Sequence, residues 1–238
     1  MPGILDKFIE EVKKIYGPNL ESIVLFGSRA SGEDTEKHSD YNLLLVVKDI
    51  NPRDLKSLNR ITRFWIRKGN PIPVIFTKKR LENSADVFPM EFYDMKDHHK
   101  VLYGEDPLRS IVIENKNLRH ECESELKGKL LKLQQGYMAS RNDADVRNLL
   151  IGSISTFLII FRHMVRLLGK MPPLKRLDAL NVLAGTIDLN PSAIVTVFDM
   201  KKGDREALKK DPDALMEEFL KEIEKVVEAV DNLQEAGL

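Results

Sequence analysis

Residues 23–47, IVLFGSRASGEDTEKHSDYNLLLVV, are the stretch of this 238-residue chain that best indicates its fold. Four apolar residues, 23–26, lead directly into Gly27-Ser28, and a polar loop then ends in the tetrapeptide SDYN, 39–42, at the start of a second apolar run. Short apolar runs that end at turn-forming residues are typical of buried strands. The stretch therefore predicts two strands joined by a polar loop, with polar side chains gathered where the strands meet the loop.

The residue types at these strand ends are suited to binding a triphosphate. Gly27 lets the backbone approach a ligand because it has no Cβ. Ser28 adds a hydroxyl and, if a helix begins there, backbone N–H groups that suit phosphate. Asp40 and Asn42 lie two residues apart on a predicted strand, so their side chains point to the same face. Two carboxylates in that arrangement would hold a divalent metal against a triphosphate, as in phosphoryl and nucleotidyl transfer.

The stretch resembles the signature of the nucleotidyltransferase superfamily, whose fold is that of DNA polymerase beta. That signature is a Gly-Ser pair, a loop, and Asp-x-Asp on the following strand, and this chain has GSRASG at 27–32 and SDYNLL at 39–44. The layout is similar to that of the minimal and aminoglycoside-type nucleotidyltransferases, which also carry a helical C-terminal domain. The similarity covers residues 20–80.

This resemblance implies a reaction and a set of site residues. The reaction is Mg²⁺-dependent transfer of a nucleoside monophosphate from ATP or another NTP to a hydroxyl of a small molecule or a protein. The residues that it implies for nucleotide binding are Gly27, Ser28, Arg29 and Ser39. The residues that it implies for the metal are Asp40 and Asn42.

The chain departs from the family pattern at two of the three acidic positions. Asn42 stands where the family has a second aspartate, and an amide offers a metal one oxygen but no charge. Pro73 stands where the third acid is expected, so Asp40 is the one carboxylate left, and we expect the metal site to be weakened. Glu91, in an apolar stretch that is predicted to be a further strand, is the candidate catalytic substitute. Its alternative interpretation is an edge-strand glutamate that faces water.

Two functions therefore remain open from the sequence. In the first, Asp40 acts with Asn42 or Glu91 and the protein is an active transferase. In the second, the acids have been lost, and the domain binds a nucleotide or a partner protein without transfer. Glutamates at 121, 123 and 125 are further candidates, because aminoglycoside-type relatives can place a general base on the helical domain.

The rest of the chain predicts an α/β (α+β) nucleotidyltransferase domain with a mixed sheet, residues 1–110, followed by an all-α helical bundle, residues 111–238. In the first domain, residues 72–77 form a third strand that the turn-forming pair Asn70-Pro71 opens, and residues 52–68 have helical periodicity. Residues 103–107 are interpreted as a helix end and a turn. In the second domain, helices are predicted at 115–139, 145–168, 172–183, 191–198 and 212–233.

Charge limits the partners that can be expected. Lys plus Arg and Asp plus Glu both number 37, so the net charge is zero, which argues against nucleic acid because its binders usually carry a basic surplus. One face of the 52–68 helix is nevertheless basic, with Arg53, Lys56, Arg60, Arg63 and Arg67. We interpret this face as solvated surface, with a phosphate- or RNA-facing surface as the alternative. The expected partners are a nucleotide and a small-molecule or protein acceptor, and a homodimer is left open.

The remaining features predict a cytoplasmic protein without a metal cluster or a membrane span. The single cysteine, Cys122, excludes a disulfide framework. The longest uncharged run, 148–161, has 14 residues, fewer than the ~20 that a spanning helix needs. His98 and His99 are interpreted as neighbours on a helix, where adjacent residues do not share a face and so do not share a metal.

Overall fold

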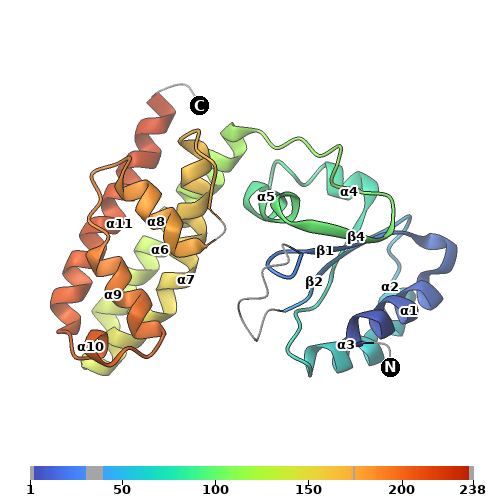
Figure 1. The fold of residues 1–238 in the computed structure, drawn as a ribbon, viewed down its shortest axis with the longest axis horizontal. Coiled ribbons are helices and arrows are strands. Elements are labelled where there is room, and N and C mark those ends of the chain that lie inside the picture. The colour runs from blue at the N-terminus through green and yellow to red at the C-terminus, as the bar shows by residue number, and fades with distance from the viewer. Residues whose placement is uncertain (1–2, 31–39, 174, 236–238) are drawn as a thin grey trace. The chain divides into compact units, whose positions relative to one another are not determined.

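The structure is a computed structural model, which describes residues 3–30, 40–173 and 175–235 (Figure 1). The chain divides into two compact units, residues 1–113 and 114–238. The first unit contains both strands and helices, and the second is helical. The predicted combination of a mixed sheet with a helical C-terminal region is confirmed.

A four-stranded sheet forms the centre of the first unit. Its strands are β1 (Leu20–Phe26), β2 (Asn42–Val47), β3 (Val74–Thr77) and β4 (His99–Gly104), in the order β3-β2-β1-β4. β1 is antiparallel to both β2 and β4, whereas β2 and β3 are parallel. The parallel pair requires a crossover, and the helices α2 (Pro52–Ser57) and α3 (Asn59–Ile66) supply it.

Helices cover both faces of this sheet, as Figure 1 shows. Leu43 and Leu45 point to the face that packs against α1 (Ile4–Tyr16) and α3. Leu44 and Val46 point to the other face, against residues of α4 (Lys78–Glu82) and α5 (Pro89–Asp97). Burial on both faces explains why β2 is an unbroken apolar run instead of an alternating one.

The strand ends that carry the sequence motif meet at one end of the sheet. Phe26, the last residue of β1, lies opposite Asn42 of β2 on one side and His99 of β4 on the other. Since Gly27 follows Phe26, the Gly-Ser pair and the residues before β2 are neighbours in space as well as in the motif.

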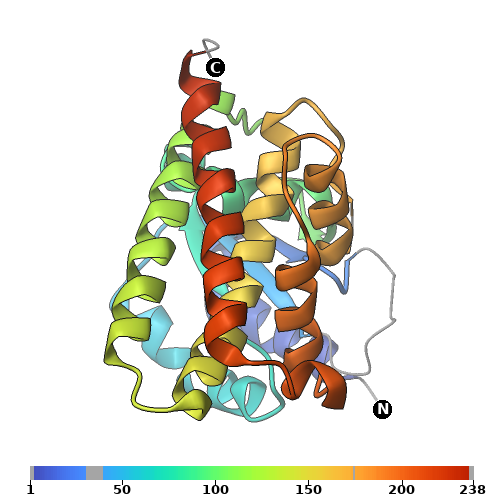
Figure 2. The same ribbon diagram turned by 90° about the vertical axis from the view of Figure 1, so that its left-hand side faces the viewer.

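The second unit is a helical bundle (Figure 2). Its helices are α6 (Asn115–Ala139), α7 (Asp143–Leu167), α8 (Arg176–Ala184), α9 (Ser192–Lys201), α10 (Arg205–Leu208) and α11 (Pro212–Glu235). Five of them match predicted helices, and the four-residue α10 was not predicted. α7 is long and apolar enough to cross a membrane by length and composition alone. Half of that apolar window is buried within the protein, as in the core helix of a bundle. The ring of Phe157, for example, packs edge-to-face against that of Phe219 in α11.

Two predicted elements of the first unit are wrong. Residues 86–94 were expected to contain a strand, but Pro89 begins helix α5, which buries Phe92 and Met95 three residues apart against the sheet. Residues 103–107 were interpreted as a helix end, but Tyr103 and Gly104 close strand β4. The helix predicted over 52–68 is divided at Leu58 into α2 and α3.

Candidate active site

The Gly-Ser pair lies in a tight turn, residues 27–30. Gly27 has φ +80°, its N–H donates to the His98 carbonyl at 2.9 Å, and its own carbonyl accepts from Ala30 N–H at 2.9 Å. A Cβ on Gly27 would lie 3.2 Å from Nδ2 of Asn42. The positive φ favours glycine, and an added Cβ would also have to displace the Asn42 amide by a few tenths of an ångström. Because the Gly27 N–H is already bonded to His98, what Gly27 offers a ligand is space, not a hydrogen-bond donor.

The acid positions lie next to this turn. Asn42 is the first residue of β2 and is half-buried, with its amide group beside Gly27. Asp40, two residues earlier, is exposed. The structure thus brings together Gly27 and Asn42, with Asp40 nearby in the chain.

Arg29 joins the turn to the residues before β2. Its Nη1 donates to the Tyr41 hydroxyl at 3.1 Å, and its guanidinium lies 4.2 Å from the centre of the Tyr41 ring. Ser28 is exposed in the same turn, and Ser39 lies outside the described residues. Tyr41 was not among the predicted site residues, because the motif leaves the position between the two acids unspecified.

Glu91 lies on the helix that covers the same face of the sheet as Asn42. Asn42 has the strand parity of Leu44 and Val46, which face α5. Glu91 is in the first turn of α5 and is exposed, whereas its neighbours Met90 and Phe92 are buried. It is therefore not an edge-strand residue, and its catalytic role stays a prediction.

Among the described residues no group of three or more His, Cys, Asp or Glu side chains could hold a metal ion. The described residues therefore do not fit a resident, all-protein metal centre. Asp40 with the amide oxygen of Asn42 does fit Mg²⁺ that arrives with a triphosphate, because protein-bound Mg²⁺ commonly uses one or two carboxylates together with substrate phosphates and water.

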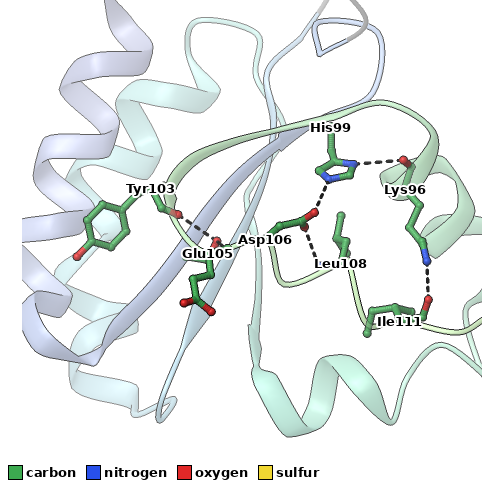
Figure 3. Close-up of polar contacts among 8 residues, drawn as sticks. Lys96, His99, Tyr103, Glu105, Asp106, Leu108 and Ile111 are labelled. Carbon is green, nitrogen blue, oxygen red and sulfur yellow. Dashed lines mark hydrogen bonds and ion pairs between the residues drawn. The ribbon is translucent and has the colours of Figure 1, made fainter.

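His98 and His99 are not neighbours on a helix, as interpreted from the sequence, because α5 ends at Asp97 and His99 begins β4. His99 contacts the segments on both sides of β4 (Figure 3). Its Nδ1 lies 3.2 Å from the Lys96 carbonyl, and its Nε2 lies 3.2 Å from Oδ2 of Asp106. The other oxygen of Asp106 accepts from Leu108 N–H at 2.9 Å, and Lys96 Nζ donates to the Ile111 carbonyl. Adjacent His98 supplies the carbonyl that holds Gly27. These contacts tie the segment after β4 to the strand end at the Gly27 turn.

Of the three glutamates considered as a general base, Glu123 is poorly suited. Its carboxylate accepts from Lys127 Nζ and Arg119 Nη1, each at 2.8 Å. The hydrogen bond from Lys127, with the contact to Arg119, lowers the pKa of Glu123. A carboxylate with a lowered pKa is a weaker base. Glu125 faces Lys129 at 3.5 Å.

Cys122 is expected to be unreactive in the folded protein. It is fully buried in α6, and burial together with the charge of Glu121 raises the pKa of its thiol. Because the thiolate is the reactive form, a thiol reagent such as dithionitrobenzoate should label Cys122 only after unfolding in urea. Stoichiometric labelling of the native protein within minutes would contradict this expectation.

The basic face of α2 and α3 is exposed, as interpreted from the sequence. The side chains of Arg53, Lys56, Arg60, Arg63 and Arg67 are all exposed. Arg60 approaches Glu11 of α1 at 3.9 Å, with 92% of its side chain accessible, a geometry that contributes little to stability. The RNA-facing alternative stays a prediction.

The mixed sheet, the glycine turn and the strand that follows an aspartate define a nucleotidyltransferase-type domain. A family model described as a nucleotidyltransferase domain matches residues 5–126, just over half of the chain. The chain belongs to this nucleotidyltransferase family.

Known proteins that are similar to the chain include a curated relative and a solved structure. A Methanocaldococcus jannaschii protein named "Putative protein adenylyltransferase" is 33% identical over 108 residues, which are 44% of this chain and 72% of that protein. The crystal structure of a spectinomycin adenyltransferase from Enterococcus faecialis with ATP and spectinomycin matches with a TM-score of 0.57, over 93% of this chain and 98% of that one. At 14% identity, this second similarity shows the fold alone.

Proposed function

We propose that this protein transfers a nucleoside monophosphate from Mg²⁺-bound ATP to a hydroxyl of an acceptor. The acceptor oxygen bonds to the α-phosphorus, the bond between the α- and β-phosphates breaks, and pyrophosphate and the hydroxyl proton are released. The single observation that carries the proposal is the Gly27 turn, held against Asn42 with Asp40 two residues away. Family membership and the adenylyltransferase relative support the same reaction class.

In this proposal, two residues of the turn contact the triphosphate and two residues at the start of β2 bind Mg²⁺. Gly27 leaves room for the triphosphate beside the strand end, and Arg29 places a positive charge at the turn. Asp40 provides the negative charge and Asn42 a neutral oxygen that would hold Mg²⁺. Mg²⁺ bound with the nucleotide would neutralise negative charge on the triphosphate during transfer.

Both a small molecule and a protein fit the proposal as acceptors. The relative from Methanocaldococcus jannaschii is named for a protein acceptor, and the Enterococcus structure contains spectinomycin. A second function, nucleotide binding without transfer, is favoured by Asn42 and Pro73, because they leave Asp40 as the one carboxylate at the three family positions.

A labelled nucleotide distinguishes the two functions. The purified protein is incubated with ATP labelled at the α-phosphate, with and without Mg²⁺, against a panel of small-molecule hydroxyl acceptors and a protein extract. An active transferase gives Mg²⁺-dependent label on an acceptor. Binding of ATP that is unchanged by Mg²⁺, together with no labelled product, would favour the non-catalytic function and overturn the first.

Replacing Asn42 by aspartate should strengthen Mg²⁺ dependence. The change adds one negative charge beside Gly27 with almost no change of shape, and a unit charge near a divalent ion contributes on the order of 1–2 kcal/mol in a solvated site. We expect the Mg²⁺ concentration at half-maximal transfer, or at half-maximal ATP binding, to fall about tenfold.

Asn83→Asp is the matched control for this substitution. Asn83 is exposed and ends α4, so the same chemical change occurs outside the site. Equal shifts for the two variants, measured by Mg²⁺ titration, would mean that Asn42 does not face the metal.

A further inference from the structure

Asn70 is a buried amide at the end of the crossover that leads from α3 to β3. The residue is 7% exposed, and Oδ1 accepts a hydrogen bond from the backbone N–H of Tyr41 at 3.0 Å. Its Nδ2 donates to the carbonyl of Trp65 at 3.4 Å. Both ends of the amide are therefore used, as expected for a buried polar side chain.

Trp65, whose carbonyl accepts the hydrogen bond from Asn70, is held in place by the core. Trp65 is fully buried, and its ring centroid lies 4.5 Å from that of Phe8 in α1 and 5.8 Å from that of Tyr41. Its indole N–H donates to the Pro71 carbonyl at 2.8 Å. Close packing and the indole hydrogen bond hold Trp65 in place. Asn70, which is hydrogen-bonded to Trp65, is thereby attached to the core of the unit.

Tyr41, the residue that Asn70 holds, lies between the two candidate metal ligands. It precedes the first residue of β2, and its N–H is bonded to Asn70. Its ring packs against the α1 and α3 side of the sheet, while Asn42 has the parity of the opposite side. A displacement of the Tyr41 backbone would therefore move the side chains of Asp40 and Asn42 together.

We infer that Asn70 is a positioning residue, which fixes the backbone between Asp40 and Asn42 and so sets the one remaining carboxylate against the Gly27 turn. This role rests on the proposed function. The position of Asp40 matters because a site with a single carboxylate has no second charged ligand that could compensate if Asp40 were displaced. A displacement of about 1 Å in a catalytic group can cost on the order of a hundredfold in rate.

The test compares Asn70→Ala with Ser22→Ala in the transfer assay with labelled ATP. Ser22 is also buried, and its hydroxyl lies 2.8 Å from the carbonyl oxygen of Glu105 and 3.1 Å from that of Tyr103, at the end of β1 away from Gly27. We expect Asn70→Ala to lower kcat/KM about a hundredfold and to raise the Mg²⁺ concentration at half-maximal transfer. Ser22→Ala should stay within about twofold of wild type.

The fluorescence of Trp65, the only tryptophan, gives the urea midpoint of each variant and separates positioning from stability. Asn70→Ser, whose shorter side chain does not reach the Tyr41 N–H, replaces Asn70→Ala if the latter does not fold. Asn70→Asp retains the acceptor for the Tyr41 N–H but loses the donor to the Trp65 carbonyl, so it should recover only part of the lost rate.

The outcomes are distinct. A wild-type protein that transfers no nucleotide would overturn the proposed function, and the role of Asn70 with it. An active wild type with an unaffected Asn70→Ala, or an equal loss of rate in Asn70→Ala and Ser22→Ala, would overturn the role of Asn70 alone.

Discussion

Asp40→Asn is expected to lower nucleotidyl transfer by about a thousandfold or more. Asp40 is the one carboxylate that remains at the three acidic positions of the family pattern, so the substitution removes the last carboxylate from those positions. Charge stabilisation by a bound metal contributes several kcal/mol to such reactions, and about 4 kcal/mol corresponds to a factor of roughly a thousand. The measurement is the initial rate of label transfer from ATP at saturating Mg²⁺.

Asp49→Asn provides the matched control for Asp40→Asn. Asp49 follows the opposite end of β2 and is exposed like Asp40, so the two variants make the same change at the two ends of one strand. Asp49→Asn should retain the wild-type rate. If Asp40→Asn retained more than about a tenth of the activity, Asp40 could not be the metal carboxylate, and Glu91 would become the next residue to replace.

The strands that carry the motif were predictable because they are buried and therefore appear in the sequence as runs of consecutive apolar residues. β2 is buried on both faces, so its side chains need no alternation and the run stands out in the sequence. α5 and β4 were missed for the opposite reason. Residues 86–104 mix charged and apolar types. Phe92 of α5 packs on the sheet face to which Val101 points, and Val101 is held in a strand by its pairing with Val24 of β1.

Of the candidate site, the sequence predicted only the residues that lie close together in the chain. Gly27 and Asn42 belong to one motif, and the structure does place them together. Asn70 was treated as a turn former before Pro71, because nothing near it in the sequence indicates a partner 29 residues away. The bond from Gly27 to His98 is likewise made by the pairing of β1 with β4, which sequence spacing does not reveal.

Gly104→Ala is expected to destabilise the first unit by about 3 kcal/mol or more. Gly104 ends β4 with φ +74°, and a Cβ there would lie 1.9 Å from the carbonyl oxygen of Glu21 in β1. A non-glycine residue at positive φ costs about 1–2 kcal/mol. Relief of the clash requires movement of the strand backbone, which breaks β1–β4 hydrogen bonds worth about 1 kcal/mol each.

Gly69→Ala separates the two causes, because Gly69 has φ +87° but nothing within 4 Å of the added Cβ. It should show the cost of the positive φ alone, and the additional loss in Gly104→Ala should measure the clash with Glu21. The urea midpoint followed by the fluorescence of buried Trp65 reports on this unit and not on the helical one. Equal midpoints for the two variants would show that β1 and β4 can separate at Gly104 without cost. The hydrogen bond from Gly27 N–H to the His98 carbonyl, at the other end of β1 and β4, would then not depend on the pairing of these two strands.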